Sequence, residues 1–179
     1  MKWMAALALG TILQPSLSVR DVDGVTREPL KVEKGHVAAL FFVTNDCPVS
    51  NYYAHEIRRI CDGYAQRGVG CSLVYTDPAM TDEQAKKHAQ DYGHGAYPKM
   101  VDRTHALVKA AGATINPTAV LVKPDGSIAY RGRIDNSFAA IGIQRRVVTE
   151  HDVRDALDAV IAGRPVVKPE EPAVGCYIQ

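Results

Sequence analysis

Cys47 stands where its thiol could react. It follows an unbroken apolar run at 37–43 and precedes Pro48, which suits the first turn of a helix because the missing N–H is not needed there. Cys47 is therefore expected at a helix N-terminus, where free N–H groups and the helix dipole favour a thiolate. A cysteine so placed commonly acts as a nucleophile or a metal ligand. The alternative is a small buried cysteine at a strand end.

Three further cysteines lie far from Cys47 along the chain: Cys61, Cys71 and Cys176. Their spacing is not that of a zinc finger, and their density is not that of a small disulfide scaffold. Cys61 falls in the expected helix and Cys71 in the next strand, so both are expected to pack in the core. A redox or copper role for one or two cysteines is favoured over a disulfide framework.

Composition narrows the class of protein. The chain has 179 residues, long enough for one domain with a sizeable core. Its hydrophobic share of 46% and charged share of 23% are typical of a globular protein. The net charge of +1 gives no reason to expect nucleic acid or an anionic membrane as a partner.

The N-terminus allows two interpretations. Lys2 and the apolar stretch 4–13 resemble the charged and apolar regions of a signal peptide, and this stretch is too short to span a bilayer as a helix. If residues 1–15 are a signal peptide, the protein is exported to the periplasm. If they are an N-terminal extension, it is cytoplasmic. Neither case predicts stable insertion into a membrane.

Periodicity and turn residues predict alternating strands and helices over 16–162. Residues 16–24 and 25–32 form a hairpin, and Thr81 with Gln84 has the spacing of a capping box. Thr149 is expected to cap the last helix, and residues 163–179, rich in proline, to form an extended tail that carries Cys176. The expected strands are 37–43, 69–75, 98–101, 119–122 and 128–134, and the expected helices are 48–66, 81–92, 104–111 and 150–162.

This order of elements resembles the thioredoxin fold, an α/β fold with a central mixed sheet flanked by helices, here with an N-terminal β-hairpin extension. In that family a cis-proline faces the reactive cysteine. Pro117, in the sequence INPT at 115–118, matches its position. The resemblance therefore implies a cis bond before Pro117, which an X-Pro bond can adopt at modest cost.

Within that fold the sequence is most similar to the AhpC/TSA redoxins, which are peroxiredoxin-like. Thr44 and Cys47 match their peroxidatic motif, but Leu40 stands where that motif has proline. The sequence CPVS at 47–50 keeps only the first cysteine of a Cys-x-x-Cys motif, so a dithiol within the motif is excluded. The segments DCPVSN at 46–51, YRGRIDN at 130–136 and GCYI at 175–178 also resemble bacterial proteins of this group.

The resemblance implies a thiol-dependent oxidoreductase that needs no cofactor. Cys47 would reduce a peroxide or a disulfide, and an external thiol would restore it. Thr44 would contact the substrate, and Arg131 or Arg133 would add positive charge. Cys176 would resolve the oxidised Cys47 within one chain or across a homodimer. Whether Cys176 pairs with Cys47 or is an unpaired tail thiol stays open.

Two other classes stay open. Copper chaperones of the Sco type share the fold, and Cys47, Cys176 and a histidine could bind Cu(I) through sulfur and nitrogen. The candidate histidines are His55 first, then His94 and His105. In this sequence Asn51 stands where the Sco pattern has its second cysteine. The third class is a binding module that has kept the fold and lost the chemistry.

Overall fold

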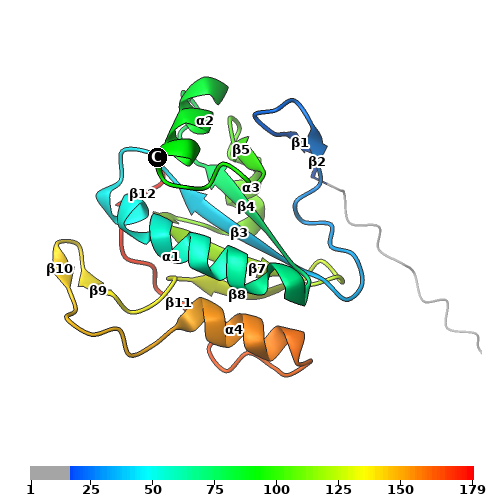
Figure 1. Ribbon diagram of the computed structural model, residues 1–179, viewed down its shortest axis with the longest axis vertical. Helices are drawn as coiled ribbons and strands as arrows, with labels where there is room; N and C mark the ends of the chain where they lie inside the picture. The colour runs from blue at the N-terminus through cyan, green and yellow to red at the C-terminus, as the bar shows by residue number, and fades with distance from the viewer. Residues whose placement is uncertain (1–16) are drawn as a thin grey trace, which may run out of the picture.

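The computed structural model describes residues 17–179 (Figure 1). The expected signal segment at 1–15 lies outside them. A hairpin of β1 (Val19–Arg20) and β2 (Thr26–Arg27) comes first, as predicted, but its strands are shorter than expected. The cause is Asp21, which is buried and whose Oδ1 accepts hydrogen bonds from the backbone N–H groups of Asp23 and Val25. The turn therefore uses donors that a longer ladder would need.

A mixed sheet forms the centre of the molecule, as predicted, with the order β11–β8–β7–β3–β4–β5. The central strand β3 pairs in parallel with β4 and antiparallel with β7. Six of its seven residues are buried, which explains its unbroken apolar sequence. The strands are β3 (Val37–Val43), β4 (Val69–Tyr75), β5 (Lys99–Val101), β7 (Thr118–Val122), β8 (Ile128–Gly132) and β11 (Glu170–Glu171).

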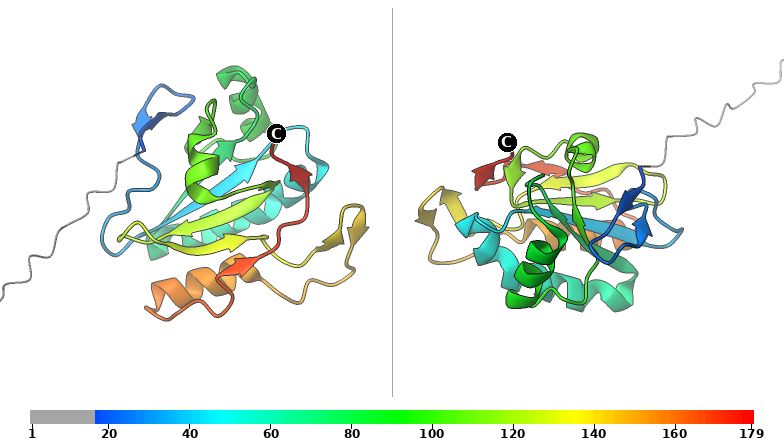
Figure 2. Two further views of the ribbon diagram at one scale, coloured as in Figure 1. Left: turned by 180° about the vertical axis from the view of Figure 1, so that it is seen from behind. Right: turned by 90° about the horizontal axis from the view of Figure 1, so that it is seen from above.

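Helices cover both faces of this sheet. The helices α1 (Pro48–Tyr64) and α4 (Asp152–Ile161) lie on one face and α3 (Ala106–Ala111) on the other (Figures 1 and 2). The helix α2 (Asp82–Asp91) adds two buried alanines, Ala85 and Ala89, to the core under α1 and α4. The core therefore consists of two apolar layers separated by the sheet.

One of the two predicted helix caps is present in the structure. Thr81 forms the predicted capping box with Gln84 at the start of α2. The prediction that Thr149 caps α4 is wrong, because α4 begins after His151. The Thr149 side chain instead accepts a hydrogen bond from Asn136 Nδ2 at 2.8 Å, and its N–H donates to Asn136 Oδ1 at 3.0 Å. Helix α1 ends in a 3-10 turn, Ala65–Arg67, before the left-handed Gly68.

The C-terminal tail is more ordered than an extended segment. Besides β11 on the sheet, it forms β12 (Cys176–Tyr177), which pairs antiparallel with β6 (Ile115–Asn116). A further hairpin, β9 (Phe138–Ala140) and β10 (Ile143–Gln144), was not predicted. Among residues 17–179, no helix combines the length and apolar character needed to cross a bilayer.

Candidate active site

Cys47 is the residue immediately before α1, as the sequence predicts. It has an extended backbone conformation (φ −87°, ψ 112°), and Pro48 is the first helical residue. Its side chain is completely buried, with 0% of its surface exposed. The seventeen-residue α1 directs its free N–H groups and positive dipole end toward this position. The local chain therefore places the sulfur where a thiolate is favoured.

The proline opposite Cys47 is in the predicted cis state. The bond between Asn116 and Pro117 is cis and lies between β6 and β7. The Cys47 thiol donates a hydrogen bond to the carbonyl oxygen of Asn116 at 3.4 Å. The segment around Pro117 therefore forms one wall of the cysteine site.

Cys176 forms the next wall. In the ladder between β12 and β6, Cys176 is the partner of Asn116 and Tyr177 is the partner of Ile115. The backbone N–H of Ile178 extends the ladder by donating to the carbonyl of Thr114 at 3.0 Å. Cys176 lies more than a hundred positions after Cys47 in the sequence, and this ladder holds it beside Cys47 in the fold.

The two thiols are electrostatically distinct. Burial alone would raise the pKa of Cys47, but hydrogen bonds from the Cys176 thiol, from Ser50 and from the Cys176 backbone outweigh it and lower that pKa. Burial, the hydrogen bond to Cys47 and the charges of Cys47 and Asp46 raise the pKa of Cys176 to about 11. The pair therefore ionises first at Cys47, while Cys176 keeps its proton.

Ser50 also belongs to this site, although the amino-acid sequence does not indicate it. Its side chain is 3% exposed, and its hydroxyl has no hydrogen-bond partner among the described residues. The hydroxyl and the Ser50 N–H both lower the pKa of Cys47. A buried hydroxyl without a partner costs free energy that a thiolate acceptor would recover. Ser50 is thus a donor available to the thiolate.

Thr44 lies at the mouth of the site. Its buried hydroxyl donates to the carboxylate of Asp46 at 2.7 Å. Thr44 and Asp46 line a pocket of about 320 Å³ together with Asn116, Cys176 and Tyr177. Because the hydroxyl proton is used within the turn, contact of Thr44 with a substrate stays a prediction.

Arg131 and Arg133 are engaged elsewhere, so the structure does not bring them to Cys47 as expected. Arg131 donates to the carbonyl of Ala111 at 3.2 Å and pairs with Glu170. Arg133 pairs with Asp152 at 2.8 Å, and with Glu150 and Glu171. The two arginines fasten the tail and α4 to β8, and the polarity at Cys47 comes from thiol, hydroxyl and backbone donors instead.

The rest of the segment 130–136 is also structural. Tyr130 is buried in the core, and Asp135 accepts a hydrogen bond from the Tyr53 hydroxyl at 2.7 Å. Asn136 holds Thr149, as described above. These contacts of Asp135 and Asn136 hold the loop that follows β8.

The copper site predicted as an alternative is not assembled. His55 is exposed on α1, where its Nδ1 lies 3.2 Å from a nitrogen of Arg58. His94 is buried beside Tyr97, and His105 lies 2.8 Å from the carbonyl oxygen of Thr76. Within residues 17–179, no three His, Cys, Asp or Glu side chains gather closely enough to hold a metal ion.

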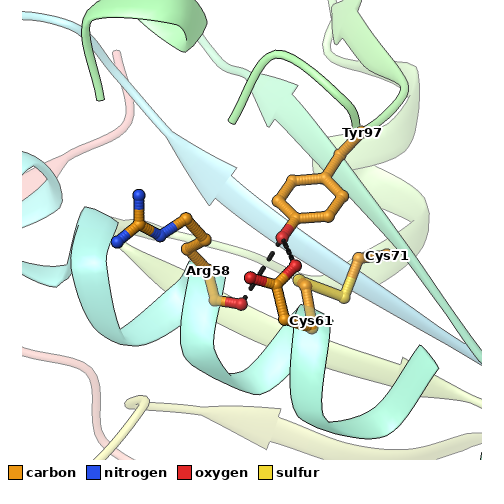
Figure 3. The surroundings of a disulfide bond; sticks show 5 residues. Arg58, Cys61, Cys71 and Tyr97 are labelled. Atoms are coloured by element: carbon orange, nitrogen blue, oxygen red, sulfur yellow. Dashed lines mark hydrogen bonds between the residues drawn. A yellow bond between two sulfur atoms is a disulfide. The ribbon is translucent and has the colours of Figure 1, made fainter. Parts of the chain in front are cut away.

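Cys61 and Cys71 form a disulfide, so the prediction that they are simple packing cysteines is wrong (Figure 3). Both cysteines do lie in the core. Helix α1 packs over β4, and because alternate β4 residues face the helix, Cys71 lies opposite Cys61. Beside the disulfide, the Tyr97 hydroxyl donates hydrogen bonds to Asp62 and to the carbonyl of Arg58. This disulfide is separate from the pair Cys47 and Cys176, which are free thiols.

A hydrogen-bond chain behind the site was also missed. Asn51 Nδ2 donates to the carbonyl of Asn45 at 2.9 Å, and His88 Nε2 lies 2.9 Å from Asn51 Oδ1. His88 Nδ1 in turn lies 2.9 Å from the hydroxyl of Tyr75. These hydrogen bonds link α2 to the turn before Cys47. Only the folded structure brings these residues together, because their spacing in sequence follows no motif.

Comparison with known proteins supports the assignment of fold. The model of the AhpC/TSA family matches residues 14–131. A crystal structure of an uncharacterized conserved protein from Geobacillus kaustophilus is 30% identical, with a TM-score of 0.78, over 92% of this chain and 88% of that one. A hypothetical protein from Sinorhizobium meliloti 1021 is 24% identical, with a TM-score of 0.76, over 97% and 95%.

More distant structures share the fold alone. A secreted disulfide oxidoreductase from Mycobacterium tuberculosis is 15% identical, with a TM-score of 0.57, over 83% of this chain and 96% of that one. A search of curated proteins gave no match. The thioredoxin-like fold, with its mixed sheet, flanking helices and N-terminal hairpin, is thus confirmed.

Proposed function

Since the chain belongs to the AhpC/TSA family, we propose that it is a thiol-dependent oxidoreductase whose redox centre is the pair Cys47 and Cys176. One observation carries the proposal. Cys176 is the ladder partner of Asn116, whose carbonyl oxygen accepts the hydrogen bond from the Cys47 thiol at the N-terminus of α1. The two cysteines therefore lie side by side, with a lowered pKa at Cys47 and a raised pKa at Cys176. A nucleophilic thiolate with a second thiol in contact is the arrangement that a dithiol–disulfide cycle requires.

The oxidant that we propose is a hydroperoxide. The Cys47 thiolate attacks the O–O bond, takes one oxygen to become a sulfenic acid and releases the other as an alkoxide or hydroxide, which takes a proton from water. Cys176, once deprotonated, attacks the Cys47 sulfur and displaces hydroxide. The products are a Cys47–Cys176 disulfide, one alcohol or water from the peroxide, and one further water. Two electrons have passed from the thiols to the peroxide.

An external thiol completes the cycle. Cys176 is partly exposed whereas Cys47 is completely buried, so an external thiolate meets the Cys176 sulfur first. Cys47 is also the better leaving group, because its pKa is the lower of the two. A second thiol then releases the mixed disulfide at Cys176. Since Cys176 reaches Cys47 of its own chain, this cycle needs no second copy.

Peroxide consumption with dithiothreitol as reductant tests the proposal. The parent chain should turn over hydrogen peroxide, and Cys47→Ser should reduce consumption to the uncatalysed rate. A Cys61→Ala/Cys71→Ala variant is the matched control, since it removes two cysteines from the same chain and should keep turnover. Turnover by Cys47→Ser at the rate of the parent chain would refute the assignment.

A further inference from the structure

The C-terminal strap, defined as residues 170–178, closes the reactive cysteine off from one side. Strand β12 of the strap pairs with the edge of β6 (Figure 2), and Asn116 of β6 accepts the hydrogen bond from the Cys47 thiol. Cys47 is completely buried in this closed arrangement. A polypeptide that brought a sulfur atom to Cys47 along Asn116 would have to lie where β12 lies.

The strap is fitted to β6 at close range. Gly175 is buried, and a Cβ atom added there would collide with the carbonyl oxygen of Asn116. No other residue type could bring the backbone so near. Two residues later the ladder continues through Tyr177 and through the N–H of Ile178. The side chain of Ile178 packs against the apolar layer on the α3 side of the sheet. The close approach therefore depends on one glycine.

The other end of the strap is fastened to the sheet. Strand β11 pairs in parallel with β8, where Glu171 lies opposite Gly132. A Cβ added at Gly132 would collide with the Glu171 backbone, so this contact also requires glycine. The pairs of Arg131 with Glu170 and of Arg133 with Glu171 reinforce it. With both ends held, the strap covers Cys47 as a fixed part of the fold.

A small opening remains beside β12. The pocket of about 320 Å³ lies between the turn at residues 44–46 and the end of the strap. Its lining is rich in polar groups, including Thr44, Asp46 and Asp77. A hydroperoxide of a few atoms fits such a space, where it would lie against Asn116 and Cys176, the two neighbours of Cys47.

From these contacts we infer that the C-terminal strap determines substrate specificity: by occupying the edge of β6 beside Asn116 it excludes polypeptide disulfides from Cys47 and leaves only the small pocket beside Cys176 for a hydroperoxide. The inference rests on the proposed function and names the substrate class of the same site. The peptide reaction that the strap suppresses is thiol–disulfide exchange. In it the Cys47 thiolate attacks a peptide disulfide, forms a mixed disulfide and expels the other sulfur as a thiolate.

Gly175→Ala is the variant that tests this inference, because it should lift β12 from β6 and keep Cys176. Gly70→Ala is the matched control, since a Cβ at Gly70 meets no atom within 4 Å. The probes are hydrogen peroxide and an unstructured peptide whose single cysteine carries thionitrobenzoate. The readout is the ratio of the peptide rate to the peroxide rate, because a change in the thiolate fraction of Cys47 alters both rates alike.

In Gly175→Ala the ratio should rise about tenfold or more, the effect of removing a local opening step of modest free energy. In Gly70→Ala it should match the parent chain. An unchanged ratio in Gly175→Ala, with faster hydrogen exchange at the Ile178 amide showing that the strap has lifted, would overturn the inference. A complete lack of reaction with peroxide in every chain would instead contradict the proposed function.

A second pair of variants covers the case in which Gly175→Ala does not fold. Both carry Cys176→Ser, and one of them ends at Ala173, so they differ only in β12 and the residues around it. The peptide should form its mixed disulfide with Cys47 about tenfold faster in the shorter chain. Equal rates in the two chains would overturn the inference independently of the glycine.

Discussion

Cys176 is the antiparallel partner of Asn116, the residue whose carbonyl oxygen accepts a hydrogen bond from the Cys47 thiol. This pairing of two short strands brings together the cysteine at the start of α1, the cis-proline segment and the tail. It also places the tail thiol where it lowers the pKa of Cys47. The properties of the site therefore depend on a ladder that involves the last residues of the chain.

Replacing Cys176 by alanine should raise the pKa of Cys47. The hydrogen bond from Cys176 favours the thiolate, while burial favours the neutral thiol and remains in the variant. The pH profile of iodoacetamide alkylation at Cys47 should move up by about one pH unit, the scale of one lost charge-assisted hydrogen bond. Cys176→Ser keeps a hydroxyl donor and should move less. A profile unchanged in Cys176→Ala would contradict this account of the thiolate.

Asn51→Ala should slow the reaction of Cys47 with peroxide by loosening the turn before it. The substitution removes the hydrogen bonds to Asn45 and His88. The expected loss in rate is about threefold to tenfold, with a loss in unfolding free energy of about 1 kcal/mol. Gln90→Ala, on the exposed side of α2, is the control. A fall in stability with no change in rate would show that Asn51 has no positioning role.

The position of Cys47 and the capping box at Thr81 could be predicted because each depends on residues close in sequence. The cis state before Pro117 could be predicted from the resemblance to the thioredoxin fold. The contacts of Arg131 and Arg133 could not, because the carboxylates that bind them come from α4 and the tail. The β12 ladder was also out of reach, since two residues carry no periodicity. For Cys61 and Cys71 a signal existed: Cys71 alternates with the buried Val69 and Leu73 on the face toward α1.

Removal of the Cys61–Cys71 disulfide should destabilise the fold and spare the redox chemistry. The bond closes a short loop, with a sequence separation of 10, between α1 and β4. A loop of this length corresponds to a loss of about 3 kcal/mol in unfolding free energy. Urea unfolding of Cys61→Ala/Cys71→Ala against the parent chain measures it. Equal midpoints and slopes would contradict a stabilising role for the disulfide.

Acid should weaken the fold through His94. This side chain is 2% exposed, and burial lowers its pKa to about 4. As the pH falls from about 6.5, the unfolded chain binds the proton first, so stability is lost until the pH reaches the folded pKa. The expected loss between pH 7 and pH 5 is about 2 kcal/mol.

Denaturant unfolding at these two pH values, in the parent chain and in His94→Leu, checks this prediction. The variant should lose most of the pH dependence, because leucine does not bind a proton. His151→Gln replaces an exposed histidine and is the matched control. An equally steep fall in stability in His94→Leu would assign the acid sensitivity to other groups.

Mass spectrometry of the reduced Cys47–Cys176 pair after one equivalent of hydrogen peroxide tests the central claim most directly. The ladder between β12 and β6 holds Cys176 opposite Asn116, which accepts the hydrogen bond from the Cys47 thiol, and the pKa is lowered at Cys47 and raised at Cys176. The account predicts a loss of two hydrogens and a proteolytic peptide pair joined through Cys47 and Cys176. A stable sulfenic acid or a more oxidised Cys47, with Cys176 still free, would contradict it.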